Sequence, residues 1–412
     1  MNYRIIAPES VTYEVNLPAS KSISNRALII KSLAGNSSRL FNVAKCDDTD
    51  AMLSALNSKA LTHINIGAAG TAMRFLTAYF AVQEGREVFL DGSERMHHRP
   101  IKVLVDALRS CGASIEYSGE EGFPPLRIKG AELNAESITL EGNVSSQYIS
   151  AILMIAPLIN GLKRIILSGN IISRPYIDMT LSIMNKFGVY THIYNNEIVF
   201  DNATQYSPLD FHIENDWSAS SYWFQIQALL YKSHITLKGL FNNSTQGDSA
   251  VARLFENFGV SINRHENSIN LKTETLVRKQ KIELNLLENP DLAQTIIVTA
   301  CLLDCPFHIT GLQTLRIKET DRIEALRSQL LKLGYVLNIE NDYSLQWNGE
   351  KCSHEKEIRI DTFDDHRMAM AFAPAAIKFP GIIINDIEVV SKSYPDYWNH
   401  LKSAGFKLEE VK

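Results

Sequence analysis

The chain has 412 residues, more than the ~100–200 residues of one ordinary domain, so its length predicts at least two domains. Hydrophobic residues make up 45% of the chain and charged residues 21%, a composition that excludes a chain too polar to bury a core. The 41 Lys and Arg against 46 Asp and Glu give a net charge of −5, which excludes the broadly basic surface of a general nucleic-acid binder. Any anion-binding site must therefore be local.

The N-terminal segment and the cysteines indicate a cytoplasmic protein with no membrane partner. No run approaches ~18 uncharged apolar residues, and the first twenty residues lack the apolar core of a signal peptide. The cysteines are odd in number and have no zinc-site spacing, so we expect free or buried thiols and no metal site. They are Cys46, Cys111, Cys301, Cys305 and Cys352.

Five junctions along the chain share one pattern. In each, an amphipathic helical pattern stops at a Gly and changes at once to the alternation of a strand. The glycines are Gly112, Gly188, Gly259, Gly334 and Gly405, so successive junctions lie 76, 71, 75 and 71 residues apart. Such regular spacing predicts an internal repeat with about six units in the chain.

A second kind of helical pattern lies between these junctions and is apolar nearly all round. The six segments are, in chain order, 24–35, 71–83, 145–159, 218–231, 290–303 and 364–377. A helix that is hydrophobic on every side belongs in an interior, so we expect α/β units with helices inside and sheets outside. A conventional α/β sheet with unusually apolar helices remains the alternative. Six units divide most naturally three and three, with a boundary near 211–217.

Polar and basic residues cluster where these buried-type helices begin. They include Lys21, Ser22 and Arg26, then Ser145, Ser146 and Gln147, and finally Asp365, His366 and Arg367. Helix N-termini carry unpaired N–H groups and a partial positive charge, which favours anions. Ser145 and Asp365 are equally good as plain helix caps. The pattern as a whole indicates a substrate pair rich in phosphate and carboxylate.

Two arginines and one charged run also indicate an anionic ligand. Arg74 and Arg367 stand among small and apolar residues, where a charge without a counter-ion or anionic ligand is costly. The run 318–322 reads as an exposed helix start with ion pairs, or as a clamp in which Lys318 and Arg322 share a helix face. In the second reading Glu319 lies beside the clamped anion and exchanges protons with it. Asp291 is a helix cap by default and a second acid/base group if it faces the same site.

Nine segments together resemble one known family. They are LPASKSISNRAL, GAAGTAMRFLTA, ERMHHRPI, VSSQYISA, SRPYID, PDLAQT, IKETDRIEAL, DDHRMAMAF and SKSYPDYW, and they span roughly residues 17–397. The chain resembles the EPSP synthases (3-phosphoshikimate 1-carboxyvinyltransferases). The resemblance implies an α/β, two-lobed enolpyruvyl-transferase fold with six βαβαββ-type repeats, buried helices, outward sheets and an active site in the interlobe cleft. It places the lobes at 19–213, on the shikimate-phosphate side, and at 1–18 plus 214–412, with the acid/base groups.

The activity that the resemblance implies is transfer of the enolpyruvyl group of phosphoenolpyruvate to the 5-hydroxyl of shikimate 3-phosphate. This step of chorismate and aromatic amino acid biosynthesis proceeds by addition and elimination and needs no metal or redox cofactor. C3 of the enol is protonated, the hydroxyl attacks C2, and the intermediate then loses phosphate and a methyl proton. Such chemistry requires two anion clamps, an acid/base pair and a site closed to water.

The resemblance also implies a role for each matching residue. The expected catalytic residues are Asp291, which takes the hydroxyl proton, Glu319, which protonates the enol carbon, and Lys21, which touches both ligands. The expected shikimate 3-phosphate contacts are Lys21, Ser22, Arg26, Ser145, Ser146, Gln147, Ser173, Tyr176, Asp291 and Lys318. The expected phosphoenolpyruvate contacts are Lys21, Gly70, Arg99, Gln147, Arg322, His366, Arg367 and Lys392.

Two positions depart from the family pattern. Ala68 and Thr314 stand where the family usually has Asn, so we expect altered affinity for the two ligands rather than lost activity. Gly70 is retained, which predicts inhibition by glyphosate at the phosphoenolpyruvate site. We expect the protein to be a monomer.

Two other functions stay open at this point. The first is the enolpyruvyl transferase that acts on UDP-N-acetylglucosamine. That enzyme generally has a Cys or Asp before the matched Arg, where this chain has His97 and His98. The second is a non-catalytic repeat protein that binds phosphorylated ligands, against which the retention of both Asp291 and Glu319 argues. Two adjacent His with no third ligand in view do not predict a metal site.

Overall fold

The computed structural model of the chain describes all residues except 36, 59–61, 144, 202–204 and 274–280. The chain forms two compact units, each described here by itself. Unit 1 comprises Met1–Pro18 and Glu214–Lys412, and unit 2 comprises Ala19–Ile213. Among the described residues no helix is long and apolar enough to cross a lipid bilayer.

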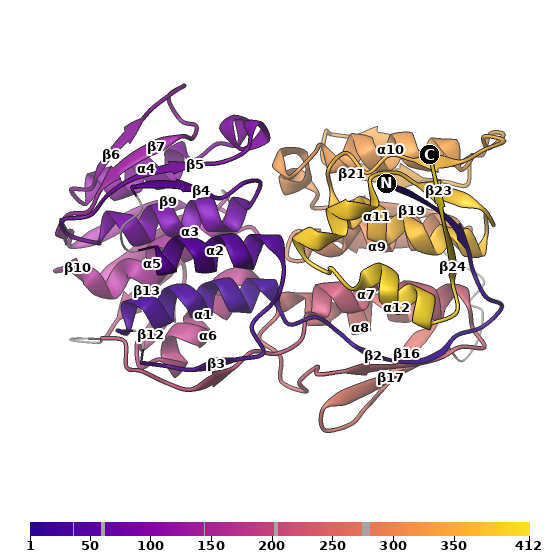
Figure 1. Cartoon of the computed structure of the whole chain (residues 1–412), viewed down its shortest axis with the longest axis horizontal. Helices are drawn as coiled ribbons and strands as arrows, with labels where there is room; N and C mark the ends of the chain where they lie inside the picture. The colour runs from indigo at the N-terminus through magenta and orange to yellow at the C-terminus, as the bar shows by residue number, and fades with distance from the viewer. Residues whose placement is uncertain (36, 59–61, 144, 202–204, 274–280) are drawn as a thin grey trace. The chain divides into compact units, whose positions relative to one another are not determined.

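Unit 2 alternates helices with short strands (Figure 1). Its helices are α1 (Lys21–Leu33), α2 (Asp47–Asn57), α3 (Gly70–Ala81), α4 (Lys102–Ser110), α5 (Ser146–Ile155) and α6 (Arg174–Lys186), with 3₁₀ turns η1 (Glu94–His98) and η2 (Ala156–Leu158). Its strands are β3 (Leu40–Phe41), β4 (His63–Asn65), β5 (Glu87–Asp91), β6 (Ser114–Tyr117), β7 (Leu126–Lys129), β8 (Leu133–Asn134), β9 (Ser137–Glu141), β10 (Ile159–Asn160), β11 (Arg164–Ser168), β12 (Thr191–Tyr194), β13 (Glu197–Phe200) and β14 (Phe211–His212).

Unit 1 has the same alternation. Its helices are α7 (Trp217–Leu229), α8 (Val251–Leu254), α9 (Ala293–Leu302), α10 (Arg322–Lys332), α11 (His366–Phe372) and α12 (Tyr397–Ser403). Its 3₁₀ turns are η3 (Gly247–Ala250), η4 (Phe255–Phe258), η5 (Pro290–Leu292), η6 (Gln313–Ile317), η7 (Ala373–Ile377) and η8 (Ile387–Lys392). Its strands are β1 (Asn2–Ile6), β2 (Thr12–Asn16), β15 (His234–Lys238), β16 (Val260–Arg264), β17 (Ser268–Thr273), β18 (Ile282–Asn285), β19 (Phe307–Thr310), β20 (Asn338–Glu340), β21 (Ser344–Trp347), β22 (Arg359–Ile360), β23 (Ile382–Ile384) and β24 (Lys407–Val411).

The sheets show the repeat directly. Five four-stranded sheets in the described ranges have the orders β4-β5-β7-β6, β9-β11-β13-β12, β2-β15-β17-β16, β18-β19-β21-β20 and β22-β23-β1-β24. In each, the first two strands are parallel and the other pairs antiparallel. The chain order β4–α3–β5–α4–β6–β7 is the expected βαβαββ unit. The last sheet is completed by β1, so the two ends of the chain pair in one sheet.

Besides these sheets, the described residues form two short parallel pairs, β3 with β14 and β8 with β10. The chain passes between the two units at two points, after β2 and after β14. Strand β2 pairs with β15 in unit 1 but is followed by α1 of unit 2, while β14 pairs with β3 in unit 2 but is followed by α7 of unit 1. The chain therefore leaves unit 1 directly after one strand and returns to it directly after another.

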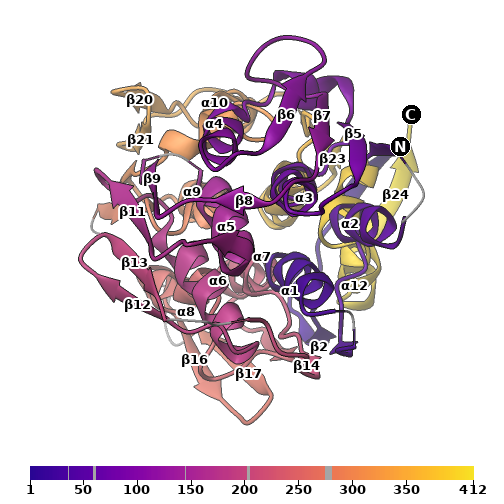
Figure 2. The same cartoon turned by 90° about the vertical axis from the view of Figure 1, so that its left-hand side faces the viewer.

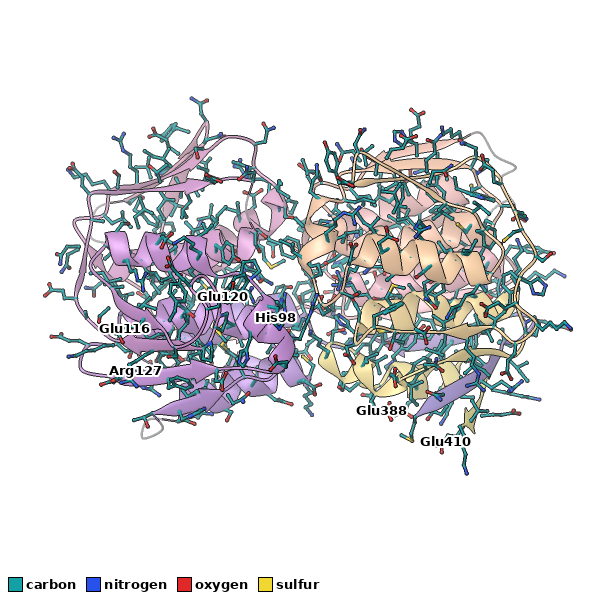
Figure 3. All side chains as sticks on the ribbon, turned by 90° about the horizontal axis from the view of Figure 1, so that it is seen from above. His98, Glu116, Glu120, Arg127, Glu388 and Glu410 are labelled. Carbon is teal, nitrogen blue, oxygen red and sulfur yellow. The ribbon has the colours of Figure 1, made fainter. Side chains whose placement is uncertain are left out.

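The helices with all-round apolar sequences are buried, as predicted. All ten residues of α9 and all seven of α11 are buried, and so are eleven of the twelve residues of α3. Figure 2 looks along α1 and α3 of unit 2, with the strands around them. On the outer side, Glu116 of β6 and Arg127 of β7 face one another and project away from the helices (Figure 3). The interior of each unit is thus helical and apolar, and the sheets expose their charged faces outward.

The five glycine junctions are confirmed. Every one of these glycines has a positive φ, between 76° and 98°, and each is followed by an extended chain. A left-handed backbone favours Gly because it lacks a Cβ, which is why the helix pattern stops there. At Gly259 the helix is short and continues as a 3₁₀ turn, η4, before the glycine.

Candidate active site

The guanidinium of Arg322 lies at the centre of a cluster of carboxylates in unit 1. Arg322 is the first residue of α10, and its side chain is only 2% exposed. Nε lies 2.6 Å from Oδ2 of Asp365, Nη2 2.9 Å from Oε2 of Glu319, and Nη1 3.3 Å from Oδ1 of Asp291. Burial alone would lower the pKa of Arg322, but Asp365, Glu319 and Asp291 raise it above its ordinary value. Arg322 is therefore a permanent cation held by three anions.

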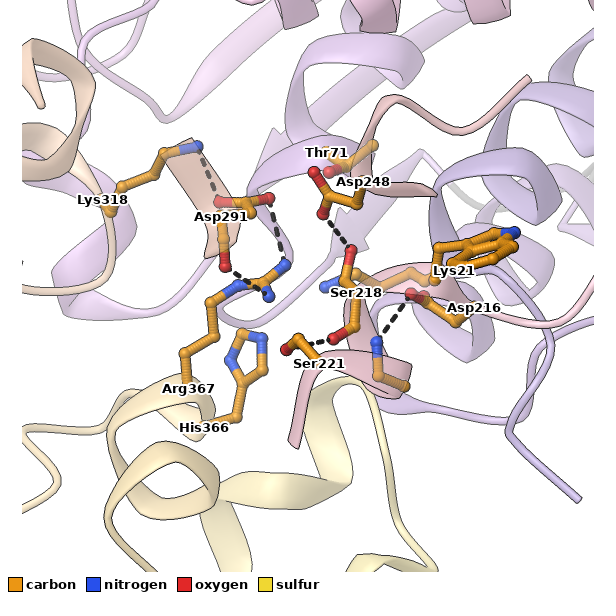
Figure 4. A network of polar contacts seen from close by, with 12 residues as sticks. Lys21, Thr71, Asp216, Ser218, Ser221, Asp248, Asp291, Lys318, His366 and Arg367 are labelled. Atoms are coloured by element: carbon orange, nitrogen blue, oxygen red, sulfur yellow. Dashed lines mark hydrogen bonds and ion pairs between the residues drawn. The ribbon is translucent and has the colours of Figure 1, made fainter. Parts of the chain in front are cut away.

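Asp291 contacts three cations, Arg322, Arg367 and Lys318, and Figure 4 shows the last two of these contacts. It lies on η5, and its Oδ2 is 3.0 Å from Nη2 of Arg367 while its Oδ1 is 3.6 Å from Nζ of Lys318. Burial opposes its ionisation, but Arg367, Lys318 and Arg322 outweigh burial and hold the pKa of Asp291 well below its ordinary value. Asp291 is consequently an ionised acceptor at neutral pH. Burial lowers the pKa of Lys318, and Asp291 acts in the opposite direction.

Glu319 connects Arg322 to a second cation. Its Oε1 lies 3.0 Å from Nζ of Lys392 on η8, and its Oε2 contacts Arg322. The side chains of Glu319 and Lys392 are 14% and 10% exposed. The two carboxylates expected to exchange protons, Asp291 and Glu319, thus share Arg322 as a partner while each keeps a cation of its own.

The predicted helix face through Lys318 and Arg322 is wrong. Turn η6 ends at Ile317, Lys318 has an extended backbone, and α10 begins only at Arg322. The reason is Asp321, whose Oδ1 accepts hydrogen bonds from the N–H groups of Ile323 and Glu324 and so caps the helix there. Lys318 nevertheless reaches the same oxygen of Asp291 as Arg322 does, because the loop brings its side chain there.

Asp365 has a second role that the sequence did not reveal. It caps α11 by accepting a hydrogen bond from the N–H of Arg367 at 2.9 Å, and it also binds Arg322. Its partner lies 43 residues away along the chain, so no local pattern could have found the pair. The next residue, His366, is buried, with Nδ1 3.8 Å from Oδ1 of Asp365.

In unit 2 the expected ligand contacts gather at the N-terminal ends of α1, α3, α5 and α6. Nζ of Lys21, the first residue of α1, lies 3.2 Å from Oδ2 of Asp48, a buried carboxylate that sequence reasoning missed. Nε2 of Gln147 donates to Oγ1 of Thr71 at 3.1 Å and thereby joins the starts of α5 and α3. Ser145 caps α5 by accepting from the N–H of Gln147 at 3.3 Å. The N-terminal ends of α3 and α5 therefore lie next to one another.

Arg26 of α1 is hydrogen-bonded to α5 and α6 as well as to its own helix. It donates to Oγ1 of Thr180 at 2.7 Å, to the carbonyl of Ser22 at 2.9 Å and to Oγ of Ser150 at 3.0 Å. Burial lowers the pKa of Arg26 to about 10. A fourth bond reaches the carbonyl of Tyr176 at 3.4 Å. Most of its donors thus bind protein groups, which fixes its side chain between α1, α5 and α6.

Three serines lie at the starts of α6, α5 and α1. Ser173, directly before α6, is buried and has φ +56°, an uncommon left-handed conformation for a serine. Ser146, the first residue of α5, is also buried. Ser22 is half-buried in the first turn of α1. Each of the three helices α1, α5 and α6 thus has a serine hydroxyl group at or next to its first turn.

Gly70 is closely covered by Arg99. A Cβ added to Gly70 would lie 2.3 Å from Nη1 of Arg99, so any larger residue would displace that guanidinium. Arg74, one helical turn later, donates to the carbonyls of Gly70 at 3.1 Å and Pro100 at 2.9 Å. The buried charge of Arg74 is therefore satisfied by carbonyl groups that flank Arg99, and Arg74 supports this site rather than binding a ligand itself.

The two adjacent histidines contact carboxylates. His97 Nε2 lies 2.8 Å from Oδ1 of Asp91, and His98 Nε2 lies 3.6 Å from Oε1 of Glu94. Within the part of the chain that the structure describes, no three His, Cys, Asp or Glu side chains are arranged as metal ligands.

Comparison with known proteins identifies the family. The model of the family "EPSP synthase (3-phosphoshikimate 1-carboxyvinyltransferase)" matches residues 5–65 and 56–401. The chain belongs to the EPSP synthase family.

Relatives named EPSP synthases or 3-phosphoshikimate 1-carboxyvinyltransferases match along nearly the whole chain. One from Bacteroides fragilis (strain YCH46) is 50% identical over 410 residues, covering 99% of each chain. One from Vibrio cholerae serotype O1 (strain M66-2) is 37% identical over 418 residues, covering 95% of this chain and 96% of the relative. A solved EPSP synthase from Acinetobacter baumannii has the same fold, with a TM-score of 0.77, 20% identity and coverage of 99% and 100%.

The EPSP synthase fold is the two-lobed enolpyruvyl-transferase fold that the sequence predicted. Neither alternative function is favoured by these relatives, which are 3-phosphoshikimate 1-carboxyvinyltransferases. The members of the EPSP synthase family are transferases, and this chain is therefore an enzyme of the transferase class.

Proposed function

We propose that this chain transfers the enolpyruvyl group of phosphoenolpyruvate to the 5-hydroxyl of shikimate 3-phosphate and releases phosphate. The observation that carries the proposal is the arrangement of Asp291 and Glu319, which contact Nη1 and Nη2 of the same buried Arg322 at 3.3 and 2.9 Å. A binding protein for anions has no use for two carboxylates among its cations. An addition and elimination reaction needs one group that gives a proton and one that takes a proton.

Asp291 is the proposed base. The cations around it keep it ionised, so it can accept the proton of the 5-hydroxyl as the oxygen attacks C2 of the enol. Lys318, which contacts Asp291, is the proposed partner of the substrate hydroxyls. This assignment agrees with the role that the family resemblance implies for both residues.

Glu319 is the proposed acid. Arg322, Arg367 and Lys392 are the proposed clamp for the phosphate and carboxylate of phosphoenolpyruvate, with His366 near the leaving phosphate. When these anions bind Arg322 and Lys392, Glu319 loses part of its ion pairing, which favours its protonated form. Protonated Glu319 gives its proton to C3. Elimination then breaks the bond between C2 and the phosphate oxygen and returns a methyl proton to Glu319.

Unit 2 supplies the remaining proposed contacts. The phosphate of shikimate 3-phosphate is expected at the helix starts, where N–H groups and the helix dipole favour anions. Its proposed partners are Lys21, Ser22, Arg26, Ser145, Ser146, Gln147, Ser173 and Tyr176. Gly70, Arg99, Gln147 and Lys21 are further proposed partners of phosphoenolpyruvate, and glyphosate is the proposed inhibitor at the phosphoenolpyruvate site.

The deciding measurement is phosphate release from phosphoenolpyruvate with shikimate 3-phosphate, set beside UDP-N-acetylglucosamine as the acceptor. We expect turnover only with shikimate 3-phosphate, and an unchanged rate after treatment with a chelator, because the reaction needs no metal. Turnover only with the sugar nucleotide would overturn the proposal. Competition by glyphosate against phosphoenolpyruvate, and sedimentation as a monomer, test the two accompanying expectations.

A further inference from the structure

A buried carboxylate outside the expected residues lies beside the acid/base site. Asp248 belongs to η3 and is only 3% exposed. Its Oδ2 accepts a hydrogen bond from Oγ of Ser218 in the first turn of α7 (Figure 4). Its Oδ1 is also buried and has no hydrogen-bond partner among the residues that the structure describes. Burying such a group is unfavourable, so a structural role alone gives little reason for a carboxylate here.

The segment of Asp248 is attached to the segment of Asp291. Nδ2 of Asn289, the residue directly before η5, donates to the carbonyl of Gly247 at 2.9 Å. One hydrogen bond thus joins the residue before Asp248 to a residue two positions before Asp291. The two carboxyl groups are held on neighbouring 3₁₀ turns, and their relative placement does not depend on a long flexible loop.

The charged groups that face Asp248 come from three elements. Asp291 on η5 and Asp216, the cap of α7, are negative, and Arg367 on α11 is positive. Arg253, the charged residue of α8, is exposed. Burial raises the pKa of Asp248 to about 6, Asp291 adds to that increase, and Arg367 opposes it. Asp248 therefore changes its charge between about pH 5 and 7, where Asp291 stays ionised.

We propose that Asp248 is a positioning residue for the proposed reaction: its buried carboxylate acts through Asp291 and strengthens Asp291 as the base that takes the hydroxyl proton. Three cations surround Asp291 and would by themselves make it a weak base. A neighbouring negative charge disfavours the ionised form of Asp291 and so restores part of its affinity for a proton. The inference rests on the proposed function, because it concerns the efficiency of that reaction.

The test compares pH profiles of kcat for the full chain and three variants. We expect the unmodified chain to lose activity on the acidic side with a midpoint near pH 6, where Asp248 becomes protonated. Asp248→Asn should lower kcat about tenfold at pH 7.5, keep the KM for phosphoenolpyruvate within about threefold and lack that acidic limb. Ser218→Ala removes the donor that stabilises the ionised carboxylate and should move the limb to higher pH.

The matched control is Asp304→Asn, which removes a carboxylate at the other end of α9, where it pairs with Lys351 and Lys378. It should leave the profile unchanged. An Asp248→Asn variant that keeps the acidic limb of the unmodified chain would overturn the proposal, whatever its rate.

Thermal unfolding separates this role from a merely structural one. The pKa of Asp248 is higher in the folded chain than the ordinary 3.8, so its ionisation removes stability as the pH rises from about 4 to about 6. Asp248→Asn should therefore have a Tm at pH 8 that is no lower than that of the unmodified chain. A lower Tm together with an unchanged acidic limb would show a structural role and overturn the inference.

A last measurement keeps the inference separate from the proposed function. If the unmodified chain lacks the proposed activity, the function fails, and ¹³C NMR of labelled aspartates still tests the titration of Asp248. A carboxyl resonance that titrates near pH 6 and is absent from Asp248→Asn supports this property of Asp248. The absence of any such resonance would overturn the inference even in an active enzyme.

Discussion

Arg322 shows how single residues create the site. Its guanidinium has contacts with three carboxylates from three different segments, and two of these are the proposed acid and base. Because a guanidinium presents its donors in a fixed fork, it holds Asp291 and Glu319 at set positions before any substrate arrives. Binding of an anionic substrate at Arg322 would then change the charge environment of both carboxylates together.

The first prediction at this scale concerns the proton-transfer pair. Glu319→Gln and Asp291→Asn keep the shapes of the side chains but remove the group that gives or takes the proton. We expect each to lower kcat by about 100- to 10,000-fold, with ligand affinity largely retained. Glu324→Gln, on the exposed face of α10 where Glu324 pairs with Arg327, is the control. A near-normal kcat for either site variant would remove that residue from the mechanism.

The second prediction concerns Gly70. In Gly70→Ala the new Cβ would lie within 2.3 Å of the guanidinium of Arg99, so Arg99 has to move. We expect a KM for phosphoenolpyruvate about 10-fold higher, weaker inhibition by glyphosate and a KM for shikimate 3-phosphate within about twofold, since one charge-assisted contact is worth roughly 1.5–3 kcal/mol. Steady-state kinetics with each substrate varied would show this. Equal increases in both KM values would contradict a local effect on Arg99.

At the scale of the secondary-structure element, the sequence predicts best the residues at which helices end. Five amphipathic helix patterns stop at a Gly with positive φ. The left-handed backbone at those positions is sufficient to explain why the residue is Gly. The start of α10 was misplaced for a comparable local reason. The charged run 318–322 looks helical throughout, but a single cap, Asp321, places the helix start after Lys318.

Two of these glycines give a prediction at the scale of the element. Gly405→Ala in unit 1 meets only ordinary contacts and should lower the free energy of unfolding by about 1–2 kcal/mol, the cost of a left-handed backbone for Ala. Gly334→Ala in the same unit also brings a Cβ to 2.7 Å of the carbonyl oxygen of Cys352, so it should lose at least about 1 kcal/mol more.

Urea unfolding of the two variants would measure the difference. Both glycines end a helix of unit 1, so both variants are compared in the unfolding of the same unit. Equal losses of stability would show that the backbone around Cys352 relaxes and would contradict the prediction.

At the scale of the whole molecule, the chain has two crossovers between its units, and one of them is fixed by a buried carboxylate. Glu214, the first residue after the second crossover, accepts hydrogen bonds from Nε1 of Trp217 at 2.7 Å and from the N–H of Phe241 at 2.8 Å. It also accepts from Oγ of Ser244 at 2.6 Å and from Nε2 of Gln246 at 2.9 Å. These bonds attach the crossover segment firmly to unit 1.

We therefore predict that Glu214→Ala destabilises unit 1. The substitution leaves these donors without their acceptor and should lower the free energy of unfolding by about 2–4 kcal/mol. Glu256→Gln, an exposed position on η4, is the control and should change stability by less than about 0.5 kcal/mol. Chemical unfolding monitored by tryptophan fluorescence reports on this unit, because Trp217 and Trp223 both lie in its core. A loss below about 1 kcal/mol would contradict the prediction.

The sequence alone determined the repeat, the buried helices and their glycine ends. These features depend on backbone conformation and on local apolar patterns, which are written in consecutive residues. The pairing of β2 with β15, and the closing of the last sheet by β1, could not be read in this way, since strand partners are chosen across the whole chain.

The same division applies to the candidate site. Local motifs and the family resemblance nominated Asp291, Glu319 and the cations around them. Only the tertiary structure decided that Asp365 neutralises Arg322 and that Asp248 lies beside Asp291, because the partners in each pair are tens of residues apart along the chain. Long-range electrostatics between such groups depends on distance in space, and spacing along the chain does not encode it.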